Sequence, residues 1–351
     1  MRAIKKSYSQ TTEHYEQISK FEKENLLKSD IESGLSSIFL ISQNFPIQDV
    51  SDFFTGENFS LLESFEELEA SYELIKYGFY KQSMISLRIG FEVGLLSIYW
   101  SIIGKKNREF KKWLSSKLDT PYKNEKFWKT LKSNQNIAKF DEKYSLIQEI
   151  KGLGFLSDFV HTKGIWHSNF GDSQRAIKGQ DKFENFKIWI QNFKQIVKIL
   201  EILHLLKFPT ICLRFSTDFL ISKFGTFSKI PQFGGGFGDE MEAVFSFIPV
   251  EQKQFIEELS KNDDKVKDII DWLSNLPNLS ENEINDAIIE EQKQNIEFGG
   301  GFANWEKNVD MLHDNRISKE MINLLREWAE QNNLMDLNSI MKKMKKNENK
   351  T

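Results

Sequence analysis

Two charged residues, Arg88 and Glu92, interrupt the most apolar stretch of the chain, which runs from Met84 to Ile103. In a helix, residues four apart lie one turn apart on one face, where opposite charges can pair. A guanidinium can hold a phosphate, a carboxylate can orient that guanidinium, and a histidine can act as general acid and base. His161 would supply the histidine. The alternative is structural, with an ion pair that bridges helices and a histidine that caps a carbonyl group.

Residues 105–143 form a second candidate, a basic segment that could bind nucleic acid. It contains twelve Lys or Arg residues and five Asp or Glu residues, a net charge of +7. Lysine and arginine neutralise phosphates, and exposed aromatic rings stack on bases. The predicted contacts are Lys105, Lys106, Arg108, Lys111, Lys112 and Trp113. The alternative is a solvated lysine face above aromatic residues that belong to the core.

The third candidate is the loop that holds His161, His167, Asp172 and Arg175. Two histidines and an aspartate can ligate a metal, but no further strong ligand lies nearby in the sequence. We therefore expect a polar loop without a metal or a cofactor. The single cysteine, Cys212, has apolar neighbours and is expected to be a small core residue rather than a nucleophile. One cysteine also excludes a disulfide framework.

The composition is that of an ordinary globular chain. Its 351 residues are 40% hydrophobic and 28% charged, which is enough to form a core. The net charge of −4 argues against nucleic-acid binding by the whole surface. The basic N-terminus precedes no apolar stretch and therefore does not resemble a signal peptide. Because charges inside a membrane span are costly, we expect a cytoplasmic protein without membrane contact.

Helical periodicity dominates the chain. The predicted helices span residues 9–43 (which Ser33–Gly34 could interrupt), two stretches between 59 and 104, 144–161, 183–206, 250–260, 263–275, 281–295, 304–313, 317–332 and 334–346. Gly90 and Gly94 form a GxxxG pattern that predicts close packing against a neighbouring helix. Only residues 210–247 would accommodate strands. Ser280 and Glu283 match a capping box at a helix start.

These elements predict a mainly α fold with two helical domains. The expected parts are an N-terminal helical segment (1–58), a helical bundle (59–206), a Phe/Gly-rich connection (207–248), an acidic helical domain (249–346) and a tail (347–351). Residues 239–330 carry a net charge of −13, opposite to that of the basic segment. The pentapeptide FGGGF occurs at 233–237 and at 298–302; because its flanks differ, we expect two flexible turns rather than a duplicated domain.

The order YGFYKQSMISLRIGFEVGLLSIYW, a basic spacer and EIKGLGFLSDFVHTKG resembles the HEPN superfamily over about residues 60–205. Its members are helical bundles common in bacterial toxin–antitoxin and antiphage systems, and many are metal-independent ribonucleases. Their catalytic pattern is an Arg followed by a His after four to six residues, and no Arg in this chain precedes a His at that distance. The likeness covers the helix order, Arg88, Glu92 and the late position of His161.

The resemblance implies a component of a bacterial defence or toxin-type system that cleaves or senses RNA or nucleotides. In that hypothesis Arg88 holds a phosphate, Glu92 orients Arg88, and His161 transfers protons. The expected partners are RNA or a nucleotide, together with a protein partner or a second copy of the chain. The alternative is a non-enzymatic interaction or scaffold protein. The opposite charges of the two halves support this alternative as well as they support the first hypothesis.

Overall fold

The computed structural model describes residues 2–44, 57–104, 106–119, 124–168, 183–231, 236–237, 245, 247–309 and 317–337. Within these ranges the chain is helical almost throughout, which confirms the mainly α prediction. Lys105, the loop residues Asp172 and Arg175, most of the connection 44–58 and the predicted helix beyond residue 337 lie outside the described residues.

The chain forms two compact units, and the first comprises Met1–Arg214 and Gln232–Ile270. Its α-helices are α1 (Arg2–Glu24), α2 (Leu27–Gln43), α4 (Glu57–Lys76), α5 (Tyr80–Ile103), α6 (Arg108–Leu114), α7 (Glu125–Ser133), α8 (Gln135–Tyr144), α9 (Leu146–Gly152), α10 (Ser157–Val160), α12 (Glu184–Lys207) and α14 (Val250–Lys261). Three 3-10 helices complete it: η1 (Leu153–Leu156), η2 (Ile165–His167) and η3 (Pro209–Cys212). Helix α15 (Asp264–Asn275) passes from this unit into the second.

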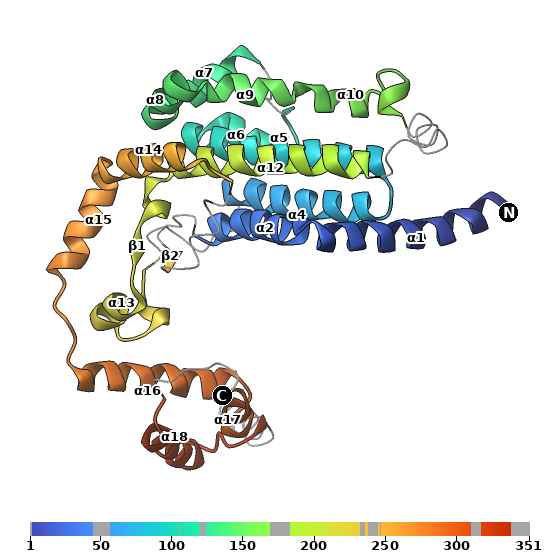
Figure 1. Ribbon diagram of the computed structural model, residues 1–351. Coiled ribbons are helices and arrows are strands. Elements are labelled where there is room, and N and C mark those ends of the chain that lie inside the picture. The colour runs from blue at the N-terminus through green and yellow to red at the C-terminus, as the bar shows by residue number, and fades with distance from the viewer. Residues whose placement is uncertain are drawn as a thin grey trace. The chain divides into compact units, whose positions relative to one another are not determined.

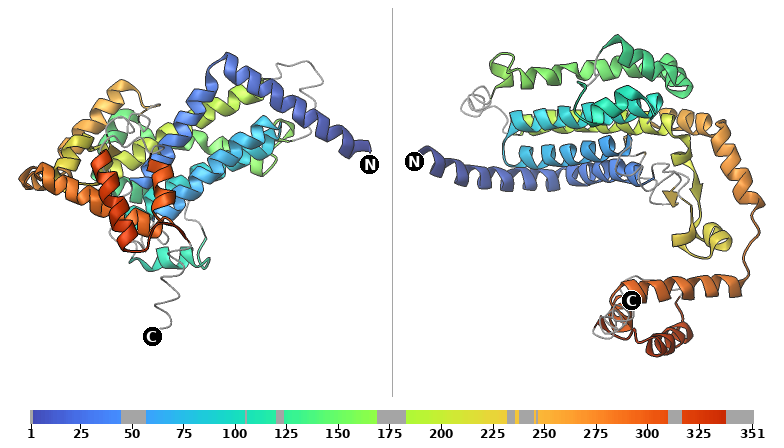
Figure 2. Two further views of the ribbon diagram at one scale, coloured as in Figure 1. Left: turned by 90° about the horizontal axis from the view of Figure 1, so that it is seen from below. Right: turned by 180° about the vertical axis from the view of Figure 1, so that it is seen from behind.

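A bundle of long helices forms the centre of the first unit. Figure 1 shows α2, α4, α5 and α12 side by side, with α7, α8, α9 and α10 as a further layer, and the reverse view in Figure 2 agrees. The predicted central helix is α5, whose residues Leu95 to Trp100 are all buried. In the part of the chain that the structure describes, α5 alone is long and apolar enough to cross a membrane; 56% of its most apolar window is buried inside the protein.

Glycines let the bundle helices approach closely. Ser64 Oγ of α4 donates to the carbonyl oxygen of Gly90, 2.7 Å away. A Cβ atom at Gly94 would lie 2.7 Å from Leu200 Cδ2 of α12 and 2.8 Å from Ser64 Oγ. The predicted role of the GxxxG pattern in close helix packing is therefore confirmed.

The N-terminal helical region breaks at a different place from the one predicted. Helix α1 ends at Glu24, and Leu26 has the left-handed backbone conformation (φ 56°) before α2 begins. Gly34 lies inside α2, where a Cβ atom would meet Phe247 Cε2 at 2.7 Å and Phe193 Cε1 at 2.9 Å. This glycine is required for packing and does not end the helix.

One further prediction of local structure is wrong and another is confirmed in part. The expected helix 144–161 consists of α9, η1 and α10, because Ser145 has a left-handed conformation (φ 56°) and the backbone tightens to a 3-10 turn at Leu153. The described part of the 207–248 connection is mostly helical, with η3, α13 (Thr217–Phe224) and η4 (Phe227–Lys229). The strands β1 (Arg214–Phe215) and β2 (Gly236–Phe237) form a two-stranded sheet, and both lie within residues 210–247, the range predicted to accommodate strands.

The domain boundary also differs from the predicted one at residue 249. Helix α14 belongs to the first unit, because Ile256 joins the main core and Ser260 Oγ donates to the carbonyl oxygen of Pro209 at 2.8 Å.

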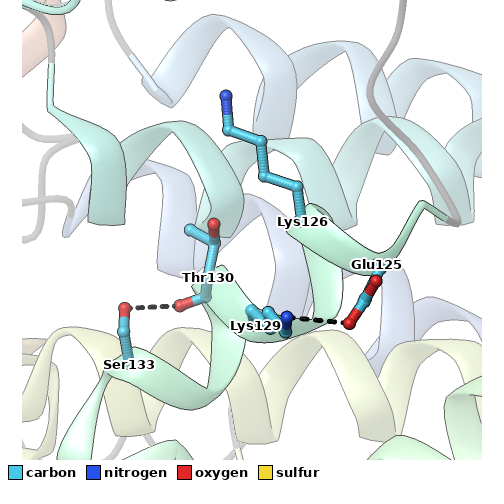
Figure 3. A pocket seen from close by; sticks show the side chains of 5 residues that line it. All are labelled: Glu125, Lys126, Lys129, Thr130 and Ser133. Atoms are coloured by element: carbon cyan, nitrogen blue, oxygen red, sulfur yellow. Dashed lines mark hydrogen bonds and ion pairs between the residues drawn. The ribbon is translucent and has the colours of Figure 1, made fainter.

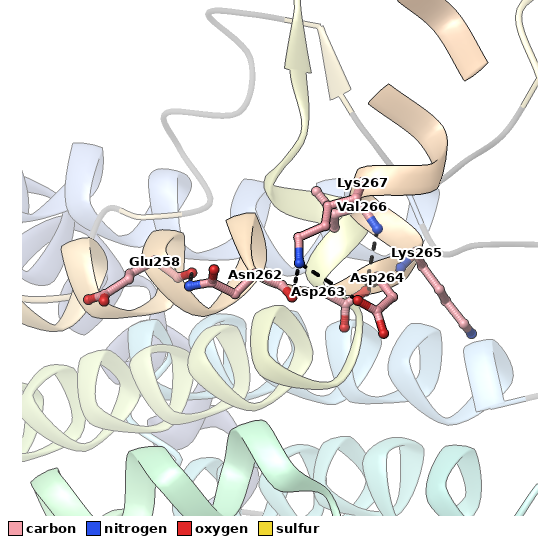
Figure 4. Close-up of polar contacts among 7 residues, drawn as sticks. All are labelled: Glu258, Asn262, Asp263, Asp264, Lys265, Val266 and Lys267. Atoms are coloured by element: carbon pink, nitrogen blue, oxygen red, sulfur yellow. Dashed lines mark hydrogen bonds and ion pairs between the residues drawn. The ribbon is translucent and has the colours of Figure 1, made fainter. Parts of the chain in front are cut away.

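The turn after α14 is fixed by polar contacts (Figure 4). Lys267 Nζ donates to the carbonyl oxygen of Asn262 at 3.0 Å and lies 3.7 Å from Asp264 Oδ1.

The second unit comprises Phe215–Pro231 and Asp271–Thr351. It contains α13, η4, α16 (Glu281–Phe298), α17 (Phe302–Val309) and α18 (Lys319–Gln331). Its small core includes Ile296, Trp305 and Leu325. The predicted capping box is confirmed: the Ser280 side chain accepts from the backbone N–H of Glu283, and the Glu283 carboxylate accepts from the backbone N–H of Ser280.

The second FGGGF copy is a fixed turn rather than the flexible one expected. Gly300 and Gly301 have φ values of 91° and 99°, a region that favours glycine. The N–H of Gly301 donates to the carbonyl oxygen of Ile296 at 2.9 Å, which closes the end of α16. A Cβ atom at Gly301 would lie 2.9 Å from the carbonyl oxygen of Leu334. Most of the first copy lies outside the described residues.

Candidate functional site

Arg88 and Glu92 form the ion pair that their spacing predicts. Arg88 Nη2 lies 2.8 Å from Glu92 Oε1, and the two side chains are 21% and 16% exposed. Arg88 Nε is buried without a hydrogen-bond partner among the described residues. A largely desolvated pair of this kind requires both partners, since removing one leaves a charge uncompensated.

His161 lies outside α5, the helix that holds the Arg88–Glu92 ion pair. It is exposed and follows the last residue of α10. Its neighbour Thr162 accepts a hydrogen bond of 2.5 Å from Lys81 Nζ near the start of α5. Arg88 is seven residues further along α5, roughly 10 Å in an α-helix. The cavity on α7 and the small cavity beside Gly78 include none of Arg88, Glu92 and His161, and no contact among the described residues brings these three together.

A buried polar group in the bundle core was not predicted from the sequence. Glu201 and His204 of α12 are fully buried, and Ser37 Oγ of α2 donates to the Glu201 carboxylate. His204 Nδ1 contacts the carbonyl oxygen of Leu200 at 2.7 Å, and its Nε2 contacts Ser97 Oγ at 3.3 Å. Burial lowers the pKa of His204 to about 4, so the imidazole is neutral at physiological pH.

This buried group has a structural role. Glu201 and His204 resemble two metal ligands on one helix face, but no group of three potential ligands exists among the described residues. Neither described cavity reaches them. The signal that could have revealed them is the same one that revealed Arg88 and Glu92, namely ionisable side chains within a continuous apolar run.

A second buried cluster lies between α1 and α4. Glu22 is 1% exposed, and burial raises the pKa of its carboxyl group. Lys76 Nζ donates to Tyr15 Oη at 3.2 Å and lies over the rings of Tyr15 and Tyr72, 4.5 Å and 4.9 Å from their centroids. These contacts hold α1 against α4 and leave Lys76 almost inaccessible to solvent.

The basic segment forms an exposed surface on α6 and α7. We define the α6–α7 surface by six residues: Lys106, Arg108, Lys111, Lys112, Lys126 and Lys129. In α6, Phe110 points into the core and is 1% exposed, so the helix presents its cations to solvent. Asn107 begins the helix by accepting a hydrogen bond from the N–H of Glu109 at 2.8 Å.

The cations of this surface fall into two groups. Lys126 and Lys129 of α7 are paired: Lys126 Nζ lies 2.5 Å from Glu109 Oε2, and Lys129 Nζ lies 2.7 Å from Glu125 Oε1. The hydrogen bond to Glu109 raises the pKa of Lys126, which therefore stays charged. The other four, Lys106, Arg108, Lys111 and Lys112, form no ion pair among the described residues.

A shallow open depression of about 410 Å³ lies on α7. Figure 3 shows its lining residues: Glu125, Lys126, Lys129, Thr130 and Ser133. Ser133 Oγ donates to the carbonyl oxygen of Thr130 at 2.7 Å. Ammonium and hydroxyl groups along one helix face suit a phosphate backbone better than an enclosed small molecule.

Trp113 packs against the protein. Its ring centroid lies 5.4 Å from that of Trp100 and 6.3 Å from that of Phe110, and its side chain is half-buried. Within the described part of the basic segment, Phe127 and Phe140 are also buried. These aromatic residues therefore belong to the core, as the structural alternative expects.

The remaining candidates are separate from this surface. His167 Nδ1 contacts the carbonyl oxygen of Lys163 at 2.6 Å, and the ring packs edge-on against Phe159. Burial raises the pKa of the Cys212 thiol to about 12, so it stays protonated at neutral pH and is a poor nucleophile.

Comparison with protein-family models, with curated proteins and with solved structures gives no match for this chain. The functional argument therefore rests on the residues and their geometry.

Proposed function

We propose that the protein binds RNA through the α6–α7 surface, contacting the phosphate backbone. The observation that carries the proposal is the group of four exposed cations on and just before α6, which form no ion pair among the described residues. By contrast, Lys132 and Lys198 of the same unit are paired, Lys132 with Asp141 at 2.9 Å and Lys198 with Glu149. Unneutralised cations close together repel one another, and a polyanion relieves that repulsion.

The contacts should be insensitive to sequence. Trp113 packs against Trp100 and Phe110, so it is not a free platform for stacking on a base. Lysine is a point charge that binds phosphates, whereas base recognition in nucleic acids mostly uses planar or bidentate groups. Of the four cations on and just before α6, only Arg108 has a planar group that can form two parallel hydrogen bonds. The function proposed is therefore sequence-tolerant recognition of RNA through its phosphate backbone.

The proposal is binding rather than cleavage. Arg88 is held by Glu92 within α5, whereas exposed His161 follows α10, and its neighbour Thr162 contacts Lys81 near the start of α5. General acid–base catalysis requires the proton-transferring group within hydrogen-bond reach of the reacting atoms, and no contact among the described residues joins His161 to Arg88 or Glu92. As a HEPN-like member of a bacterial defence or toxin-type system, the protein would sense RNA and pass that signal to a partner.

The test is a binding assay with the full chain and a fluorescently labelled 20-nucleotide RNA. The variant Lys111→Ser/Lys112→Ser removes two cations of the α6–α7 surface, and Lys261→Ser/Lys265→Ser removes two exposed lysines elsewhere as a charge-matched control. Two lost phosphate contacts should weaken binding roughly tenfold or more at 0.1 M salt. Equal binding by both variants, or no binding by the wild type, would reject the proposal.

A second experiment separates binding from cleavage. Wild type and His161→Ala are expressed in a bacterial host, and growth and total RNA are examined. Intact RNA in both cultures is expected. Growth arrest with cleaved RNA, lost in His161→Ala, would instead establish a nuclease with an unusual site.

A further inference from the structure

Phosphate contacts on the α6–α7 surface do not separate RNA from DNA, because both polymers present the same phosphates. The two differ in the ribose 2′-hydroxyl group, which only RNA carries and which can donate a hydrogen bond. An ionised carboxylate accepts hydrogen bonds and has none to donate, so it suits a hydroxyl group and repels a phosphate. Carboxylates held among the cations of this surface would therefore distinguish the two polymers.

Two carboxylates are held in this way. Glu109 Oε2 of α6 lies 2.5 Å from Lys126 Nζ of α7, and Glu125 Oε1 lies 2.7 Å from Lys129 Nζ. Figure 3 shows the second pair at the depression on α7. Each pair uses one carboxylate oxygen. The other oxygens, Glu109 Oε1 and Glu125 Oε2, accept no hydrogen bond among the described residues, and the two side chains are 45% and 81% exposed.

Helix α7, which carries three of these four residues, is firmly supported by α5. Phe127 is fully buried, and its ring stacks on that of Tyr99 with centroids 5.1 Å apart. Tyr99, which is also buried, forms a hydrogen bond with the Thr130 side chain. The backbone that bears Lys126 and Lys129 is thus in place before RNA arrives, which lowers the entropy cost of binding.

Donors and acceptors alternate on this surface as they do along an RNA backbone. The ammonium groups of Lys126 and Lys129 donate to phosphate oxygens, and the adjacent carboxylates can accept from ribose hydroxyl groups. Deoxyribose offers the carboxylates no such donor, so next to DNA they only repel the phosphates. The pairing of each carboxylate with a lysine therefore fits a ligand in which hydroxyl and phosphate groups lie side by side.

We infer that Glu109 and Glu125 make the α6–α7 surface selective for RNA over DNA by accepting hydrogen bonds from ribose 2′-hydroxyl groups. This inference rests on the proposed function and specifies which nucleic acid the surface binds. A solvent-exposed hydrogen bond of this kind changes the affinity about threefold. Two such contacts give a preference for RNA of about tenfold.

The test compares binding of the full chain to a labelled 20-nucleotide RNA and to DNA of the same sequence at 0.1 M salt. The variant Glu109→Ala/Glu125→Ala removes both acceptors. The control Glu24→Ala/Glu32→Ala removes two exposed carboxylates of α1 and α2 that also pair with lysines, at 3.7 Å and 3.5 Å. Wild type and control should prefer RNA about tenfold, whereas the variant should bind RNA and DNA within about twofold of each other.

The ratio of the two affinities separates hydroxyl recognition from other roles of these carboxylates. Glu109 and Glu125 lie in the first turns of α6 and α7, where negative charge stabilises a helix. If that role or their charge alone mattered, the variant would change both affinities by one factor. An unchanged ratio would therefore overturn the inference.

Two results for the wild type are also decisive. Equal affinity for RNA and DNA would overturn the inference and leave the phosphate contacts standing. Absence of binding to both polymers would reject the proposed function itself. All substituted side chains are exposed, so circular dichroism should show unchanged helix content in the variant and the control.

Discussion

Replacing Gly94 by alanine tests the packing of α5 against its neighbours. In an open helix the change would stabilise the protein by about 1 kcal/mol, because alanine has the higher helix propensity. At Gly94 the new Cβ atom would lie 2.7 Å and 2.8 Å from the two Cδ atoms of Leu200 and 2.8 Å from Ser64 Oγ. Leu200 is fully buried, and the Ser64 hydroxyl is committed to Gly90, so neither can move freely.

Forcing a methyl group into such a core costs about 1–3 kcal/mol, and we place Gly94 in the upper part of that range. The expected net loss is about 1–2 kcal/mol. Gly152→Ala is the matched control, since Gly152 has helical dihedral angles and no atom within 4 Å of the new Cβ atom. That variant should gain about 0.5–1 kcal/mol.

The stability of both variants is measured by urea unfolding, monitored by tryptophan fluorescence. The urea concentrations at the midpoints should move in opposite directions, while the slope of the free energy of unfolding against urea stays unchanged. A Gly94→Ala protein as stable as Gly152→Ala would refute the close approach of α4, α5 and α12 that underlies this fold.

Three further predictions concern other parts of the chain. His204 has a pKa of about 4 in the folded protein and about 6.5 in the unfolded chain. Between pH 6.5 and pH 4 the unfolded chain therefore binds more protons than the folded protein. The free energy of unfolding should consequently fall by about 3 kcal/mol as the pH falls through this range. Chemical denaturation across this pH range should show a free energy of unfolding that depends less on pH in His204→Gln than in the wild type. Ser280→Ala should destabilise α16 by about 1 kcal/mol and Ser280→Gly by only a few tenths, measured by hydrogen exchange of the first α16 amides. Cys212 is half-buried and burial raises its thiol pKa to about 12, so it should react with a thiol reagent at pH 8 much more slowly in the native than in the urea-unfolded protein. Equally rapid labelling of both states would contradict the raised pKa.

The sequence predicts the long helices well because their periodicity extends over many turns. Helices α4, α5 and α12 begin and end within a few residues of the expected positions, and Ser280 begins α16 as its capping box indicates. The Arg88–Glu92 pair was also predictable, since both partners lie on one helix and the contact depends only on local geometry.

Long-range features could not be derived in this way. Gly34 suggests a helix break by its type, yet Phe193 and Phe247 pack against it from distant segments. The depth of Glu201 and His204 depends on α2, α5, α8 and α14 together covering α12, which an amphipathic pattern does not reveal. The position of His161 relative to Arg88 depends on the break of helix 144–161 into three short elements.

The salt dependence of RNA binding tests the central claim most directly. The apparent affinity for a labelled 20-nucleotide RNA is measured between 50 and 300 mM KCl for the wild type, for Lys111→Ser/Lys112→Ser and for the control Lys261→Ser/Lys265→Ser. Each phosphate contact to a single strand contributes about 0.7 to the slope of log affinity against log salt, so losing two should reduce the slope by about 1.4. An unchanged slope in the α6 variant, or an equal reduction in the control, would contradict RNA binding through the α6–α7 surface.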